Sequence, residues 1–141
     1  MTLVPERREE LTTEGGLDVT ASSRKLAEIA AKLKGGGIRV SLFVDADLDQ
    51  VKESLRVGAQ AVEIHTGRYA NASASDDVRA ELERVADAVS LAAKIGLEPL
   101  AGHGLDYRNI GSARAHPGHR GGQHRPRDHG AERCWWGWRR R

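Results

Sequence analysis

Hydrophobic and polar residues follow two different periods along the first 110 residues of the chain. Short apolar runs bounded by glycine, proline or acidic residues predict four strands, at residues 3–4, 38–44, 61–64 and 97–101. Apolar residues repeating at helical spacing predict three helices, at 24–34, between Asp47 and Gly58, and at 76–95. Because strands and helices alternate, the pattern predicts an α/β fold of parallel strands joined by right-handed crossovers.

Each predicted helix has an apolar face and end signals. The first begins after a cap at Ser22 or Ser23, and the second after Asp47, with Gln50 completing a capping box. Gly35, Gly58 and Gly96 are the expected stop signals. The predicted buried faces are Leu26, Ile29, Ala30 and Leu33, then Val51 and Leu55, then Val78, Leu82, Val85, Val89 and Ala92.

Polar residues gather at the carboxyl ends of the predicted strands, where TIM barrel enzymes carry their chemistry. They are Glu6, Asp45, Asp47, Glu63, His65 and His103. This placement favours a TIM barrel over a doubly wound sheet. A complete barrel needs eight βα units and roughly 250 residues. With 141 residues, we expect about half a barrel, with four parallel strands and three helices.

Three places in this half barrel carry candidate chemistry. Glu63 and His65 alternate with apolar residues on one strand, where a carboxylate needs a cation, a donor or a ligand. His103 lies between two glycines and could act as a general acid or base. Residues 12–16 form a polar loop able to bind an anion. The structural alternatives are an ion pair for Glu63, a loop contact for His103 and a helix cap for Asp47.

Four longer motifs, in order, carry a family resemblance. They are Leu3-Val4-Pro5-Glu6 with Thr12-Thr13-Glu14-Gly15-Gly16-Leu17-Asp18-Val19, then Arg39-Val40-Ser41-Leu42-Phe43-Val44-Asp45-Ala46-Asp47, Glu63-Ile64-His65-Thr66-Gly67-Arg68-Tyr69-Ala70, and Ala101-Gly102-His103-Gly104-Leu105. Together they resemble the pyridoxine 5'-phosphate synthases of vitamin B6 biosynthesis.

The resemblance implies a cytoplasmic TIM barrel enzyme. Such an enzyme condenses 3-amino-2-oxopropyl phosphate with 1-deoxy-D-xylulose 5-phosphate and releases phosphate and water, without a cofactor or a metal. By the same resemblance His103 is the proton donor, Glu63 stabilises a transition state, and Thr12 and Gly104 contact substrate. His65 gains no role from the family and stays a weaker candidate. Members of the family form octamers, so a homo-oligomer is expected.

Several family motifs have no counterpart in this sequence. An Asn-x-Asp-His motif, and a later histidine and glutamate that act as acid/base residues, would precede residue 1. The family's phosphate-binding Asn-Ile-Gly-His segment near its end is also missing, because the match stops at Gly111. We therefore expect little or no turnover from this chain alone. The alternative class is a half-barrel fragment without enzymatic activity that carries a basic nucleic-acid-binding arm.

Composition changes abruptly after residue 110. Residues 1–110 hold 14 Lys and Arg against 18 Asp and Glu, whereas 111–141 hold eight Arg against one Asp and one Glu. The second segment has no Val, Ile or Leu but contains all three Trp and the only Cys, so we expect a disordered tail. A lone Cys134 cannot form an internal disulfide, which fits a reducing, cytoplasmic setting. No membrane segment or signal peptide is expected either.

The tail allows three interpretations. Codons for residues 122–134, shifted by one base, are compatible with the family's missing Asn-Ile-Gly-His, so we hypothesise a frameshift from about residue 112 onward. Arginine and tryptophan could instead bind nucleic acid. A metal could be held by a histidine and cysteine set, although its spacing matches no regular zinc pattern. That set is His116, His119, His124, His129 and Cys134.

Overall fold

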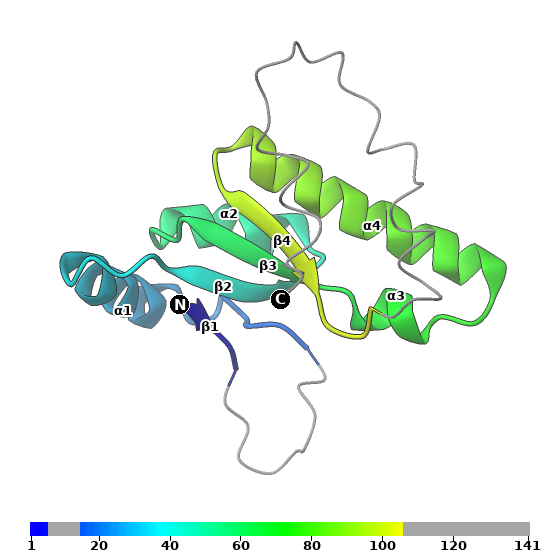
Figure 1. Cartoon of the computed structure of the whole chain (residues 1–141), viewed down its shortest axis with the longest axis horizontal. Coiled ribbons are helices and arrows are strands. Elements are labelled where there is room, and N and C mark those ends of the chain that lie inside the picture. Colours follow the sequence, from blue (N-terminus) through cyan, green and yellow to red (C-terminus); the bar gives the residue numbers. More distant parts are fainter. Residues whose placement is uncertain (6–14, 106–141) are drawn as a thin grey trace, which may run out of the picture.

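The structure, a computed structural model, describes residues 1–5 and 15–105 of the chain. Four strands, β1 (Thr2–Leu3), β2 (Ser41–Asp45), β3 (Ala61–His65) and β4 (Glu98–Gly102), form one sheet in the order β1-β2-β3-β4. Every neighbouring pair is parallel. Figure 1 shows these strands side by side. The predicted α/β class with four parallel strands is confirmed, and the sheet is not closed into a barrel.

Helices connect successive strands. They are α1 (Ser23–Gly35), α2 (Leu48–Arg56), α3 (Gly67–Asn71) and α4 (Ser75–Lys94). The three helices predicted from periodicity correspond to α1, α2 and α4. The five-residue α3 was not predicted, because it is too short to show a helical repeat. It precedes α4 and packs against it, as Figure 1 shows.

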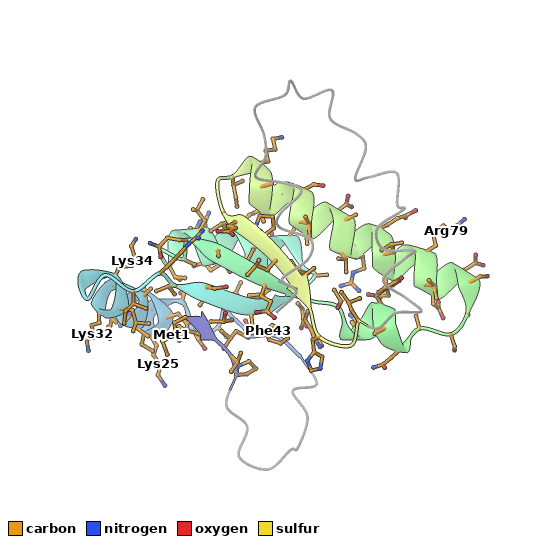
Figure 2. All side chains as sticks on the ribbon, in the orientation of Figure 1. Met1, Lys25, Lys32, Lys34, Phe43 and Arg79 are labelled. Carbon is orange, nitrogen blue, oxygen red and sulfur yellow. The ribbon has the colours of Figure 1, made fainter. Side chains whose placement is uncertain are left out.

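The hydrophobic core lies between the sheet and the helices. Side chains alternate across a strand, so every second residue of β2 and β3 faces the helices. Those residues are fully buried: Leu42, Val44, Val62 and Ile64. They pack with Leu26 and Ala30 of α1, Val51 of α2, and Leu82, Val85, Val89 and Ala92 of α4. The charged faces of the helices lie outside, as the outward-pointing Lys25, Lys32 and Arg79 illustrate in Figure 2.

Helix α2 departs from its predicted buried face. Leu55 was predicted to be buried with Val51, but its exposed fraction is 42%, and Ser54 is fully buried in its place. Ser54 Oγ donates a hydrogen bond of 2.8 Å to the Gln50 carbonyl oxygen. Its short side chain, satisfied within the helix, lets α2 pack closely and turns Leu55 outward.

The predicted capping box of α2 is half correct. Asp47 caps the helix, since its Oδ1 accepts from the backbone N–H groups of Asp49 and Gln50 at 2.8 and 3.0 Å. Gln50 does not return the bond, because the Asp47 N–H already donates to the Asp45 carbonyl oxygen at 2.7 Å. The Gln50 side chain instead accepts from the Val19 N–H at 2.7 Å and so ties α2 to the segment before α1. At α1, Ser22 occupies the N-cap position without a side-chain capping bond.

Three predictions from the sequence concern residues outside the described ranges. Glu6 and Thr12 belong to residues 6–14, and the tail assignment concerns residues 111–141. The nucleic-acid arm, the metal ligands and the frameshift therefore stay predictions.

The outward turn of Leu55 predicts a contrast between two leucines. Leu82→Ala, at a site with 6% exposure, should lower the free energy of unfolding by about 2–5 kcal/mol, because it leaves a cavity in the core. Leu55→Ala should change it by less than about 1 kcal/mol. Urea unfolding of both variants measures the two changes. Equal losses would place Leu55 in the core after all.

The Asp18 carboxylate predicts a dependence of stability on pH. Hydrogen bonds from the Thr20 hydroxyl, the Ala21 N–H and the Gln50 amide lower the pKa of Asp18 below its ordinary value of 3.8. Because the folded-state pKa is lower, this stabilisation is complete above that value and is lost as pH falls through the folded-state pKa. Thermal melts should therefore show Asp18→Asn less stable than the wild type at neutral pH, with the gap narrowing below pH 3.8. A gap independent of pH would refute this.

Candidate active site

The site forms where β2, β3 and β4 end. The parallel register aligns Phe43 with Glu63 and Leu100, and two residues later Asp45 with His65 and Gly102. These residues lie on the face of the sheet opposite to the helices, since the residues between them are packed in the helical core. Polar groups on this face therefore gather at the carboxyl edge, where a βα barrel opens.

Three rings form the centre of the site. The His65 and His103 rings are 4.8 Å apart between centroids, and the Phe43 ring contacts both edge-on at 5.1 and 6.0 Å. Phe43 and His65 are buried, whereas His103 is exposed. In Figure 2 the Phe43 label marks this end of the strands. The buried pair forms the floor of the site, and His103 is accessible from solvent.

Glu63 lies beside this cluster and is half-buried. A Cβ atom on Gly102 would lie only 3.1 Å from Glu63 Oε1, so the carboxylate passes directly over the backbone at the end of β4. The ion pair considered for Glu63 is not among the salt bridges of the described residues. The structure thus brings the two principal sequence candidates, Glu63 and His103, to the same edge of the sheet.

The turn after β4 fixes the backbone of His103. His103 has a φ of 76° and Gly104 a φ of 80°, so both adopt the left-handed conformation. For a residue with a side chain this conformation costs roughly 1–2 kcal/mol. A Cβ on Gly104 would lie 2.8 Å from the Ala70 Cβ, so glycine is required for the turn to pack on α3. Gly104 therefore serves the sharp turn expected from the sequence, whereas Gly102 leaves room for the Glu63 carboxylate.

Thr66 holds this turn against the end of β3. Its hydroxyl lies 2.8 Å from the Gly102 carbonyl oxygen and 2.7 Å from that of His103, and its N–H donates to the Gly102 carbonyl oxygen at 3.0 Å. Thr66 is 2% exposed, so these bonds are shielded from water. No local sequence pattern indicates this role of Thr66, because its partners lie 36 and 37 residues away along the chain.

Asp45 joins the preceding loop to His65. Its Oδ1 accepts from the Gly16 N–H at 3.0 Å and lies 3.1 Å from His65 Nδ1. A Cβ on Gly16 would lie 2.3 Å from the Asp45 nitrogen, so only glycine can cross the end of β2 so closely. Leu17 completes the crossing by donating its N–H to the Phe43 carbonyl oxygen at 2.7 Å. The sequence placed Asp45 at the strand end but could not indicate that it orients an imidazole.

Within residues 1–5 and 15–105, no group of three or more His, Cys, Asp and Glu side chains is arranged to hold a metal ion. No helix in this part of the chain is long and apolar enough to span a membrane.

The sheet is parallel, and it carries a carboxylate and two imidazoles at the carboxyl ends of adjacent strands. These features are typical of the βα-barrel enzymes, of which this chain forms part of the active-site mouth. A comparison with protein families identifies the particular family. The family model described as pyridoxal phosphate biosynthesis protein PdxJ matches residues 1–120. The chain belongs to this family.

Curated relatives agree with the family model. The pyridoxine 5'-phosphate synthase of Geobacter sulfurreducens is 56% identical over 109 residues, which cover 77% of this chain and 46% of that protein. The synthase of Geobacter metallireducens gives the same values. That of a Synechococcus strain is 49% identical over 118 residues, or 84% of this chain and 49% of that protein. The chain thus spans about half the length of these relatives, and the resemblance seen in the sequence is confirmed.

The hydrogen bonds of Thr66 to the turn after β4 predict a loss of stability when the Thr66 hydroxyl is removed. Thr66→Val keeps the side-chain shape but leaves two shielded carbonyl oxygens with fewer donors, which should cost about 1–3 kcal/mol of unfolding free energy. Thr66→Ser retains the hydroxyl and is the matched control, expected to lose clearly less. Denaturant unfolding compares the two variants. Equal losses would mean that the methyl group, not the hydroxyl, stabilises the turn.

Proposed function

We propose that this chain carries part of the active site of a pyridoxine 5'-phosphate synthase. The observation that carries the proposal is the convergence of Glu63 and His103 at one edge of the sheet, in a chain 56% identical to a protein of that name. The reaction joins 3-amino-2-oxopropyl phosphate to 1-deoxy-D-xylulose 5-phosphate and releases phosphate and water. The partners are accordingly small phosphorylated substrates.

The geometry suits the proton transfers of this condensation. When an amine adds to a ketone, the resulting hydroxyl leaves as water only if it receives a proton, and the nitrogen becomes positively charged as it departs. The exposed His103 ring is placed to donate that proton. The Glu63 carboxylate, half-buried beside it, is placed to stabilise the positive charge.

The other groups around the site support this division of roles. Phe43 and His65 form a floor without free water access, which strengthens the electrostatic effect of Glu63. The left-handed turn places His103 and Gly104 together over α3, so a substrate contacting His103 also meets the Gly104 backbone. Thr12 precedes Gly16 in sequence, whose N–H donates to Asp45 at the end of β2. We assign Thr12 to substrate binding by family resemblance.

The cellular location and the oligomeric state follow from the same proposal. We assign the chain to the cytoplasm, supported by its single cysteine. A homo-oligomer, and catalysis without a cofactor or a metal, are expected from the family.

A chimera tests the proposed roles without relying on this chain alone. Residues 1–105 would replace the matching segment of the Geobacter sulfurreducens synthase, and pyridoxine 5'-phosphate would be measured from both substrates. The chimera should be active. His103→Asn and Glu63→Gln should each lower kcat by at least about a hundredfold, since each removes a group that acts in the transition state.

The control is Glu98→Gln, a half-buried carboxylate paired with Arg39 at the opposite end of β4, which should leave kcat within about twofold. A folded but inactive chimera, or a His103→Asn chimera with unchanged kcat, would refute the proposal.

A further inference from the structure

His65 is the one imidazole of the site to which neither the family resemblance nor the proposed function gives a role. Its side chain is 5% exposed, and its Nε2 has no hydrogen-bond partner among the described residues. A buried polar atom without a partner costs free energy, so its position calls for an explanation. The environment of the two ring nitrogens supplies one.

The Asp45 contact decides which nitrogen carries the proton. A carboxylate only accepts hydrogen bonds, so the 3.1 Å contact between Asp45 Oδ1 and His65 Nδ1 requires the proton on Nδ1. A second N–H at Nε2 would be a buried donor without an acceptor in the described part of the chain. The contacts of the described residues thus favour the tautomer with the proton on Nδ1, in which Nε2 can accept a hydrogen bond.

The lone pair lies on the side of His103. A Cβ placed on Gly67 would lie 2.6 Å from His65 Nε2 and 3.6 Å from His103 Cδ2, so both rings border the same glycine. Their centroids are 4.8 Å apart and their planes are inclined by 54°. An N–H···N bond of about 2.9 Å between two imidazoles needs a similar separation of ring centres. Forming this bond requires a rotation of the His103 side chain, which is exposed.

We propose that His65, oriented by Asp45, is a positioning residue that accepts a hydrogen bond from one ring nitrogen of His103. This deepens the proposed function and rests on it for the catalytic role of His103. With one N–H of the His103 imidazolium held by His65, the other nitrogen faces the substrate and carries the transferable proton. After the transfer, the remaining N–H stays bonded to His65, so the same nitrogen is ready to be protonated again.

This arrangement also explains why position 67 is glycine. Any side chain there would occupy the space in which His65 Nε2 and the His103 ring meet. The Phe43 ring contacts both imidazoles edge-on and confines them to this side of the sheet.

The first test reads the tautomer of His65 and needs no activity. The full chain, labelled with 15N-histidine, would be examined by NMR, with signals assigned through His65→Gln and His103→Gln. The wild type should show His65 protonated at Nδ1 and not at Nε2. Asp45→Asn keeps an acceptor oxygen and should preserve this tautomer, whereas Asp45→Leu removes the acceptor and should lose it. An Nε2–H tautomer in the wild type, or no change in Asp45→Leu, would overturn the proposal.

The second test uses the chimera. His65→Leu should lower kcat by about tenfold to a hundredfold, the range seen when a group that orients a functional histidine is removed, with KM little changed. His65→Gln offers an acceptor oxygen and should recover part of the loss. Equal effects of Leu and Gln would overturn the positioning role. An inactive wild-type chimera would refute the proposed function instead, while the tautomer result in the chain would still stand.

Discussion

The parallel register of β2, β3 and β4 is the constraint on which the rest of the structure depends. It aligns Asp45, His65 and Gly102 across three strands, and the pleat then points the Asp45 and His65 side chains away from the helices. A shift of one residue in any strand would turn its polar side chains into the apolar core and its apolar ones into the mouth. The apolar residues between them, Val44 and Ile64, are fully buried, and this burial makes such a shift too costly.

On this frame, the site is built from contacts between segments far apart in sequence. Asp45 joins partners 29 residues before it and 20 residues after it, and Thr66 reaches 36 residues forward to the turn after β4. Each of these residues follows or ends a strand, so the sheet fixes the backbone from which it acts. His103 lies in a loop, but its backbone is held in place because the Thr66 hydroxyl bonds to the carbonyl oxygens of Gly102 and His103.

The sequence predicted the elements better than their contacts. Apolar runs and helical spacing located all four strands and the three longer helices, since burial of one face imposes a repeat that the residues display. Leu55 shows the limit: hydrophobicity alone favoured its burial, but the small Ser54, bonded within the helix, packs inward instead. Glu63 and His103 became candidates because polar residues at strand ends are conspicuous. The roles of Thr66 and Asp45 arise from long-range bonds, which no local pattern reveals.

The two faces of the sheet divide stability from chemistry. The mouth holds costly features, among them the left-handed His103 and a buried nitrogen of His65 that lacks a partner in the described residues. Such features persist only where the surroundings over-determine them. Here the surroundings are the helix-facing side chains of the same strands, which supply burial without any polar group to satisfy. Successive residues of a strand alternate between the two faces. The same strands that carry the site residues therefore also carry the core residues, and the burial of those core residues offsets the free-energy cost of the site.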